Sequence, residues 1–169
     1  IPAQWILDPT LMMNREQWAT IAKKPAEKKP YLLIYQLNGN REMDEYAVAL
    51  AKQKQWSIVR IGFSYPVKQP LGKCVVSPSV EELLGYMMHA QCVLTDSFHA
   101  TAFSLNLGTD FISVLPQRFG TRIESILNLT NTKQRLLRDY QDIAIADRKI
   151  DKKQVREILD REREKGMAF

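Results

Sequence analysis

The chain has 169 residues, a formal net charge of +5 and 45% hydrophobic residues, which fits one globular domain with a core of its own. This composition excludes a disordered chain, a collagen and a disulfide-rich scaffold. Its apolar stretches fall far short of the ~20 residues that a membrane-spanning helix needs. The first residue is Ile1 rather than Met, so we expect the chain to be a piece of a longer protein.

The excess of basic residues is not arranged as in a nucleic-acid-binding protein. From Asp147 to Lys165 the basic and acidic residues alternate, which is typical of a solvated helix. A second group of lysines, from Lys23 to Lys29, surrounds a proline and is expected to form a loop. We therefore expect no nucleic-acid partner, and an anionic small-molecule substrate fits the positive charge equally well.

The two cysteines favour an intracellular, reduced protein, because two thiols do not make a disulfide framework in a chain of this size. Cys74, His89, Cys92 and His99 match no compact spacing of zinc ligands, so we expect no metal site. We expect a cytoplasmic location, with peripheral attachment at the inner face of the membrane as a further option.

In chain order, capping boxes, apolar runs and turn residues predict alternating helices and strands. The predicted elements are a helix from Arg15 to about Lys23, a strand at 31–37, a helix at 43–55 with Tyr46, Val48, Leu50 and Ala51 as core residues, a strand at 57–61, a helix at 80–89, a strand at 92–95, a helix at 98–107, a strand at 111–115, a helix at 122–129, a short strand or turn at 142–146, and a C-terminal helix at 150–166.

Apolar strands that alternate with helices indicate an α/β fold, with a doubly wound parallel sheet and helices on both faces. In such folds ligands bind beyond the carboxyl ends of the strands. The loops expected to carry a site are therefore Asn38–Arg41, Gly62–Pro66, Asp96–His99 and Pro116–Arg122.

The segment from Thr95 to Ser104 is the most informative part of the sequence. A helix begins just after Thr95, and its first turn offers free backbone N–H groups and the positive end of the helix dipole, which bind phosphate or carboxylate. Ser97 adds a hydroxyl group, and His99 adds a donor of hydrogen bonds or protons near neutral pH. A structural role is also open, with Asp96 or Ser97 as the helix N-cap and His99 as an interior histidine.

A second candidate element lies between the strand at 111–115 and the next helix. An arginine there binds carboxylate or phosphate through paired hydrogen bonds, and we favour Arg122 over Arg118 for this role. A structural alternative is that either arginine caps a loop or pairs with Glu124.

Other common chemistries are excluded by the sequence. Asp96, Ser97 and His99 lie too close together on one turn to form a hydrolase triad, whose members converge from separate loops. The sequence has no G-x-S-x-G, no dinucleotide-binding G-x-G-x-x-G and no P-loop.

Several segments resemble the polysaccharide pyruvyl transferase family. They are Leu7-Asp8-Pro9-Thr10-Leu11-Met12, Trp18, the strand Tyr31–Tyr35, Val80-Glu81-Glu82-Leu83-Leu84, Ala90 and, above all, Val93-Leu94-Thr95-Asp96-Ser97-Phe98-His99-Ala100-Thr101-Ala102-Phe103-Ser104. Thr121-Arg122-Ile123 matches an arginine that often follows in the same branch. The resemblance spans nearly the whole chain, and the block around His99 is quite specific.

The resemblance implies two Rossmann-like halves that face each other across a cleft, as in GT-B glycosyltransferases. Residues 1–169 would form a single C-terminal domain, with 1–14 as the interdomain segment and the N-terminal half as its missing partner. Members of the family transfer an enolpyruvyl-derived group from phosphoenolpyruvate to sugar hydroxyls and so form a pyruvate ketal on a cell-surface glycan. The resemblance implies no metal or cofactor, and it implies a glycan or a lipid-linked sugar as acceptor.

The resemblance also implies roles for residues. The helix end at Ser97–His99 would bind one anionic group of the donor, Arg122 would bind the other, and His99 would act as general acid. We expect Asp96, Ser97, Phe98, Thr101, Arg122 and Asn38 to contact the substrate. The isolated half is expected to be inactive, because the other side of the cleft is absent.

One position departs from the family pattern. Several branches have arginine two residues before the histidine, where this chain has Ser97, and a hydroxyl group does not supply that charge. Another anionic donor, such as a nucleotide sugar, therefore stays open. The alternatives are a nucleotide-sugar-dependent glycosyltransferase half of the GT-B type and a non-catalytic domain that binds anions or carbohydrate.

Overall fold

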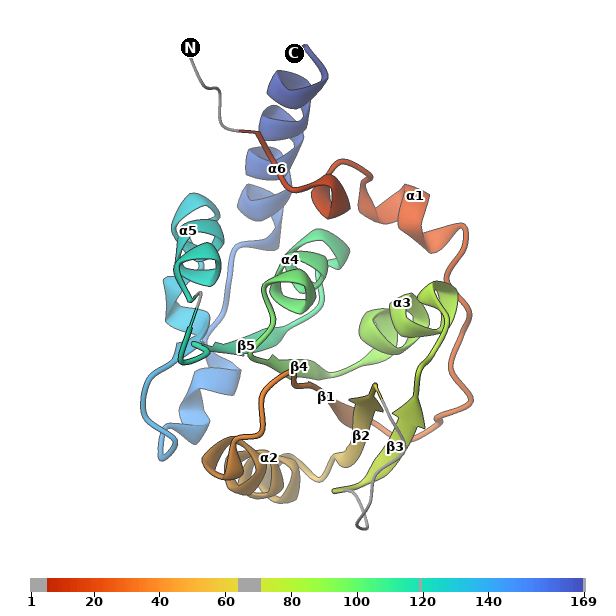
Figure 1. Ribbon diagram of the computed structural model, residues 1–169, viewed down its shortest axis with the longest axis vertical. Coiled ribbons are helices and arrows are strands. Elements are labelled where there is room, and N and C mark those ends of the chain that lie inside the picture. The colour runs from red at the N-terminus through yellow and green to blue at the C-terminus, as the bar shows by residue number, and fades with distance from the viewer. Residues whose placement is uncertain (1–5, 64–70, 119, 169) are drawn as a thin grey trace.

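A six-stranded parallel sheet runs through the part of the chain that the structure describes. This structure is a computed structural model that describes residues 6–63, 71–118 and 120–168. The strands are β1 (Tyr31–Tyr35), β2 (Ser57–Gly62), β3 (Lys73–Val76), β4 (Cys92–Thr95), β5 (Phe111–Val114) and β6 (Leu136–Leu137). Their order is β3-β2-β1-β4-β5-β6, so the sequence runs outward in both directions from β1 and β4 (Figure 1). This order is the one typical of dinucleotide-binding α/β folds and confirms the predicted fold class.

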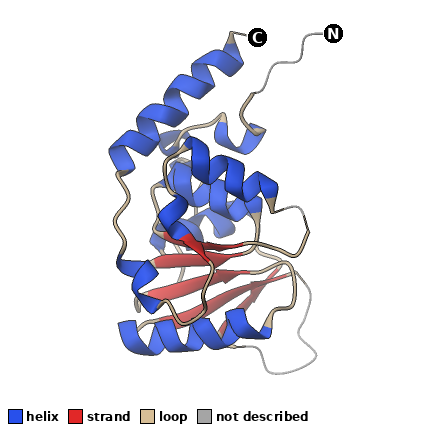
Figure 2. Cartoon of the chain, turned by 90° about the vertical axis from the view of Figure 1, so that its left-hand side faces the viewer, coloured by secondary structure: helices blue, strands red, loops and turns tan. Residues whose placement is uncertain are grey.

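Helices cover both faces of the sheet (Figure 2). They are α1 (Arg15–Ala19), α2 (Arg41–Lys54), α3 (Val80–His89), α4 (Phe98–Leu107), α5 (Thr121–Leu129) and α6 (Lys152–Met167), with short 3-10 helices η1 (Pro9–Leu11), η2 (Lys133–Arg135) and η3 (Ile143–Asp147). One core joins the sheet to α3, α4, α5 and α6, and a second core joins the other face to α2 and η3. β1 lies in the middle, where Leu33 pairs with Val59 of β2 and Val93 of β4.

Most predicted elements are confirmed, and their ends follow from local chemistry. Asn14 and Ser79 form the capping boxes that begin α1 and α3. Gly108 adopts a left-handed conformation and ends α4. The last helix, predicted at 150–166, is confirmed as α6.

Some details of the prediction are wrong. α1 ends at Ala19 rather than near Lys23, and β1 ends at Tyr35 rather than at residue 37. The short strand or turn predicted at 142–146 is not a strand, because residues 143–147 form a 3-10 helix. Val48 is 45% exposed because the buried face of α2 is formed by its neighbours at helical spacing, among them Met43 and Leu50. The sequence pattern also failed to predict the edge strands β3 and β6, because β6 has only two residues and β3, although as long as β4, has no fully buried residue.

The N-terminal segment packs against the domain itself. Residues 6–14, part of the predicted interdomain segment 1–14, lie along α4 and α6, whereas Trp5 and the rest of that segment fall outside the described residues. Asn106 Nδ2 donates to the carbonyl oxygens of Thr10 and Met13 at 3.3 and 2.8 Å. Arg163 Nε donates to Leu11 O at 2.6 Å, so α6 holds the segment from the other side.

The backbone before β1 passes very close to α3. Lys23 N donates to Glu81 O at 2.8 Å, and a Cβ atom at Gly85 would lie only 1.7 Å from Lys23 O. This contact explains why α1 ends early, because the chain after Ala19 must leave the helix to run along α3.

We predict that Gly85→Ala destabilises the protein by about 2 kcal/mol or more, since the new methyl group meets backbone and not a movable side chain. The measurement is the free energy of unfolding in urea. Gly39→Ala is the matched control, because a Cβ atom there meets nothing within 4 Å, and its effect should stay within about 0.5 kcal/mol. Equal stability of the two variants would contradict the prediction.

Candidate functional site

The strands β1 and β4 lie side by side, but the chain leaves them toward opposite faces of the sheet. After β1 it enters α2, and after β4 it enters α4 on the other face (Figure 1). A crevice at the carboxyl ends of two such strands is where ligands bind in this class of fold. The predicted loops Asn38–Arg41 and Asp96–His99 border it. Of the predicted loop Gly62–Pro66, residues 64–66 fall outside the described residues.

Asp96 ties these two loops together. Its carboxylate accepts hydrogen bonds from Leu37 N at 2.7 Å, Asn38 N at 3.0 Å and Asn38 Nδ2 at 2.9 Å, and the residue is only 5% exposed. Both carboxylate oxygens are therefore occupied within the protein. The structure brings Asp96 and Asn38 together, but it uses them to fix the loops.

Ser97 is the N-cap of α4, as the structural alternative proposed. Its Oγ atom accepts a hydrogen bond from Ala100 N at 3.4 Å, and the residue is buried. Thr101 is also fully buried, where its hydroxyl group donates to Ser97 O at 2.9 Å and shares a hydrogen bond with Ser113 Oγ at 2.8 Å. The structure therefore turns the Thr101 side chain toward β5, where it bonds to the backbone of Ser97 but does not meet His99 or Arg122.

His99 lies on the open side of the first turn of α4, with its side chain 52% exposed. The alternative of an interior histidine is therefore wrong. Its ring lies edge-on to that of Phe98, with 5.4 Å between ring centroids. The guanidinium carbon of Arg122, from the start of α5, lies 3.9 Å from the centroid of the Phe98 ring. Phe98 thus contacts both polar side chains, with the Arg122 guanidinium over its ring and the His99 ring at a steep angle to it.

Asp8 joins His99 and Arg122, and the sequence analysis did not identify it as part of the site. Its Oδ2 atom accepts a hydrogen bond from Arg122 Nη2 at 2.8 Å and lies 3.9 Å from His99 Nε2. Arg122 therefore pairs with Asp8 rather than with Glu124, the partner considered in the sequence analysis. The available signal was the Asp8-Pro9-Thr10 pattern, because aspartate before proline is a helix cap.

A cavity of about 270 Å³ opens beside this charged group. We call it the first cavity. It is lined by Ile6, Leu7, Asp8, Leu11, Phe98, Thr121, Arg122, Ser125 and Ile126. Most of its wall is apolar, and its polar groups are one carboxylate, one guanidinium and two hydroxyl groups. Arg118, the other predicted arginine, does not line it, and Phe119 falls outside the described residues.

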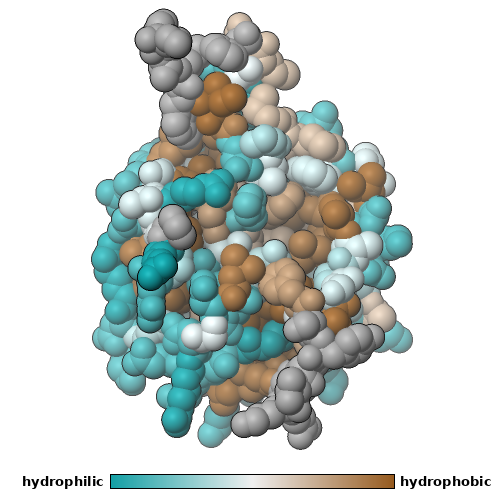
Figure 3. All heavy atoms as spheres, in the orientation of Figure 1, coloured by the Kyte–Doolittle hydropathy of each residue, from teal (hydrophilic) through white to brown (hydrophobic). Residues whose placement is uncertain are grey.

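The surface around the carboxyl ends of the strands is partly apolar. Leu37 and Phe63, which follow β1 and β2, are 55% and 54% exposed. Figure 3 shows hydrophobic side chains exposed through the middle of one face of the molecule, between hydrophilic margins. The region around the site therefore offers both apolar and charged surface to a ligand.

The remaining candidate residues do not form a metal centre in the described part of the chain. Among residues 6–63, 71–118 and 120–168, no three His, Cys, Asp or Glu side chains are grouped so that they would hold a metal ion.

Burial raises the pKa of the Cys92 thiol to about 12, so this thiol stays protonated at neutral pH. None of the described helices is both long and apolar enough to cross a membrane.

The charge on Asp8 is favoured by its surroundings. Burial alone would raise the pKa of this carboxyl group, but hydrogen bonds from Thr10 and the charges of His99 and Arg122 bring it below the usual 3.8. The ionised form therefore stabilises the fold at any pH above that value, and this contribution is lost as the pH falls below it.

We predict that Asp8→Asn lowers the free energy of unfolding by about 1 kcal/mol at pH 7. The amide oxygen can still accept from Thr10, but the charge that pairs with Arg122 is gone. Urea unfolding of both proteins from pH 7 downward should show the difference shrinking as the pH falls from 3.8 through the lowered pKa of Asp8 in the folded protein, where the wild-type side chain also becomes neutral. A difference that does not change with pH would contradict this account.

The family model described as polysaccharide pyruvyl transferase matches residues 1–118, which is more than half of the chain. No curated protein sequence matches the chain.

Two solved structures are similar at low sequence identity. One is a dodecameric, iron-containing heptosyltransferase, TibC, in complex with ADP-D-beta-D-heptose (10% identity, TM-score 0.43, covering 56% of this chain and 29% of that one). The other is described as a UDP-N-acetylglucosamine 2-epimerase from Listeria monocytogenes (11% identity, TM-score 0.49, covering 93% of this chain and 43% of that one). The chain thus spans less than half the length of either.

Proposed function

The chain belongs to the polysaccharide pyruvyl transferase family, and from this we propose that it is the donor-binding half of a transferase that moves a pyruvyl group from phosphoenolpyruvate to sugar hydroxyls. The observation that carries the proposal is that His99 and Arg122 meet at Asp8, beside a cavity at the carboxyl edge of the sheet that Asp8, Arg122 and Phe98 of the first turn of α4 line. His99 itself does not line this cavity. In this proposal an N-terminal half forms the other side of the cleft, and the acceptor sugar is a second substrate.

Two anionic groups of phosphoenolpyruvate match two donors of this site. Ala100 N already donates a hydrogen bond to Ser97 Oγ. The backbone N–H groups of Phe98 and His99 have no partner among the described residues, and they lie at the positive end of the α4 dipole. They suit a phosphate group. Arg122 uses Nη2 for Asp8, which leaves its other N–H groups to a carboxylate.

The negative charge of Asp8 lies beside Arg122 and affects how an anionic donor can bind there. An incoming carboxylate has the same chemistry as Asp8, so it either shares Arg122 with Asp8 or takes its place. The side chain of Arg122 is 53% exposed, which leaves its outer edge open to a ligand.

In the proposed reaction His99 acts as general acid. It gives a proton to the methylene carbon of the enolpyruvyl group, the electron-poor carbon that results bonds to the oxygen of a sugar hydroxyl group, and the proton of that hydroxyl group returns to His99. A second hydroxyl group then bonds to the same carbon and closes the ketal, while the phosphate leaves with the two electrons of its C–O bond and takes up the proton of this second hydroxyl group. The exposed position of His99 beside the cavity suits a proton donor that must reach the substrate.

We predict that phosphoenolpyruvate shifts the backbone amide NMR signals of Phe98 and His99 and that Arg122→Gln weakens its binding about tenfold. Arg118→Gln is the matched control, because it removes the same charge from the same loop without touching the cavity. A UDP-sugar that binds while phosphoenolpyruvate does not would favour the glycosyltransferase alternative.

We predict that His99→Ala in the whole enzyme lowers the transfer rate by about 10²- to 10⁴-fold and leaves the affinity for phosphoenolpyruvate within a few fold. The measurement is formation of the ketal on an acceptor glycan. Normal transfer by the variant would show that His99 is not the general acid. Turnover by the isolated chain would contradict the view that it is only half of the active site.

A further inference from the structure

A second cavity lies at the opposite end of α4 from His99. His99 is in the first turn of this helix, whereas Gly108, which ends the helix, lines the second cavity. The cavity has a volume of about 100 Å³, and it is lined by Asn14, Arg15, Glu16, Leu105, Asn106, Gly108, Lys152, Arg156, Leu159, Asp160 and Arg163. It therefore brings together the starts of α1 and α6 and the end of α4, at the amino edge of the sheet.

One of the residues that line the second cavity, Arg163, is fixed by hydrogen bonds to three partners. Arg163 is buried and donates to Leu11 O at 2.6 Å, to Asn106 Oδ1 at 2.7 Å and to Asp160 Oδ1 at 2.5 Å. Each nitrogen atom of this buried arginine thus donates to a protein partner, and together the three bonds hold the N-terminal segment, α4 and α6.

The rim carries cations that the protein does not neutralise. Arg15 and Arg156 form no ion pair or side-chain hydrogen bond with any residue in the described ranges, whereas Lys152 is held by Asp110 at 3.1 Å. Four cations and two anions line the cavity, and one of the anions, Asp160, is already paired with Arg163. The other anion is Glu16, so the lining keeps a net positive charge.

From these contacts we propose that the second cavity binds a phosphate group through Arg15 and Arg156, with Lys152 beside them. An arginine side chain is always charged and presents paired N–H donors that match the oxygens of a phosphate group. The second cavity is smaller than the first, about 100 against 270 Å³, which favours a small tetrahedral anion over a whole nucleotide.

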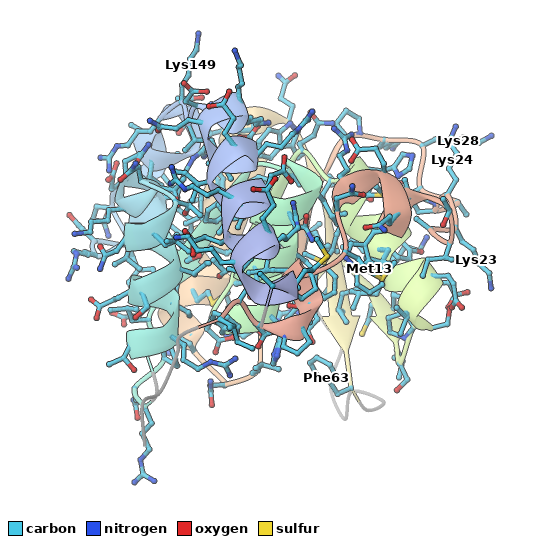
Figure 4. All side chains as sticks on the ribbon, turned by 90° about the horizontal axis from the view of Figure 1, so that it is seen from above. Met13, Lys23, Lys24, Lys28, Phe63 and Lys149 are labelled. Atoms are coloured by element: carbon cyan, nitrogen blue, oxygen red, sulfur yellow. The ribbon has the colours of Figure 1, made fainter. Side chains whose placement is uncertain are left out.

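The wider charge pattern supports an anion at this edge. Figure 4 shows Lys24, Lys28 and Lys149 on the side of the molecule opposite Phe63, which follows the carboxyl end of β2. None of these three lysines forms an ion pair with a described residue. They add to a positive field that attracts anions toward the amino edge.

The first test measures inorganic phosphate with the chain itself. Phosphate should move the side-chain Nε–H signals of Arg15 and Arg156 in NMR spectra and raise the melting temperature by several degrees over chloride at equal ionic strength. Either single substitution, Arg15→Gln or Arg156→Gln, should weaken phosphate binding about tenfold, and the double variant should lose the rise.

Two controls separate this site from general effects of phosphate. Arg118→Gln removes one positive charge away from the second cavity and should keep the full rise in melting temperature. Arg122→Gln, which alters the first cavity, should leave the signals of Arg15 and Arg156 responding as before, so this proposal can fail or succeed separately from the proposed function. A full rise in the double variant would overturn the proposal, and so would arginine signals that phosphate leaves unmoved in a chain that also fails to bind anionic vesicles.

A second arm asks where the phosphate group comes from. Binding to vesicles of phosphatidylglycerol, compared with phosphatidylcholine, tests a lipid headgroup as the source. Binding to the anionic vesicles that is lost in the double variant, with little response to free phosphate, would assign the cavity to a headgroup at a membrane surface. Response to free phosphate without vesicle binding would assign it to a soluble phosphate compound, and response to neither would overturn the proposal.

Discussion

The carboxylate of Asp96 is the contact on which the arrangement of the site depends. The chain leaves the two central strands in opposite directions, because β1 is followed by α2 on one face of the sheet and β4 by α4 on the other. Asp96 spans this division with three hydrogen bonds to Leu37 and Asn38. Since α4 begins two residues later, the same contact fixes where the helix end, and with it His99, can lie. Asp96 thus shapes the crevice from inside.

A second layer of contacts gives the site its charge. Asp8 comes from a segment with little secondary structure of its own, and that segment is held by Asn106 and Arg163 through backbone carbonyl groups. The position of the Asp8 carboxylate beside Arg122 therefore depends on Asn106 and Arg163, neither of which lines the first cavity. An ordinary packing contact, between α6 and the N-terminal segment, is in this way part of the electrostatics of the site.

The fold could be predicted from the sequence because its signals are local. Central strands such as β1 and β4 are buried on both faces and show as continuous apolar runs, and helix starts show as capping boxes. The edge strands lack this signal, because β6 has only two residues and β3 has no fully buried residue.

The candidate site was predicted less completely, for two physical reasons. His99 and Arg122 follow from the rule that ligands bind where strands end, so their region could be predicted. Asp8 could not, because it meets Arg122 across 114 residues of sequence. Thr101 was misplaced because α4 is almost entirely small and apolar, so its sequence has no polar face to show which side meets the sheet.

The hydrogen bond between Arg163 and Leu11 joins positions 152 residues apart, near the two ends of the described chain. During synthesis the segment around Leu11 leaves the ribosome before α6, so its anchor on Arg163 forms only after α6 has followed. The sheet and α4 can fold earlier, since their contacts are closer in sequence. The wall that carries Asp8 is therefore secured only when translation has passed α6, so a chain interrupted before that point would have a sheet without a finished pocket.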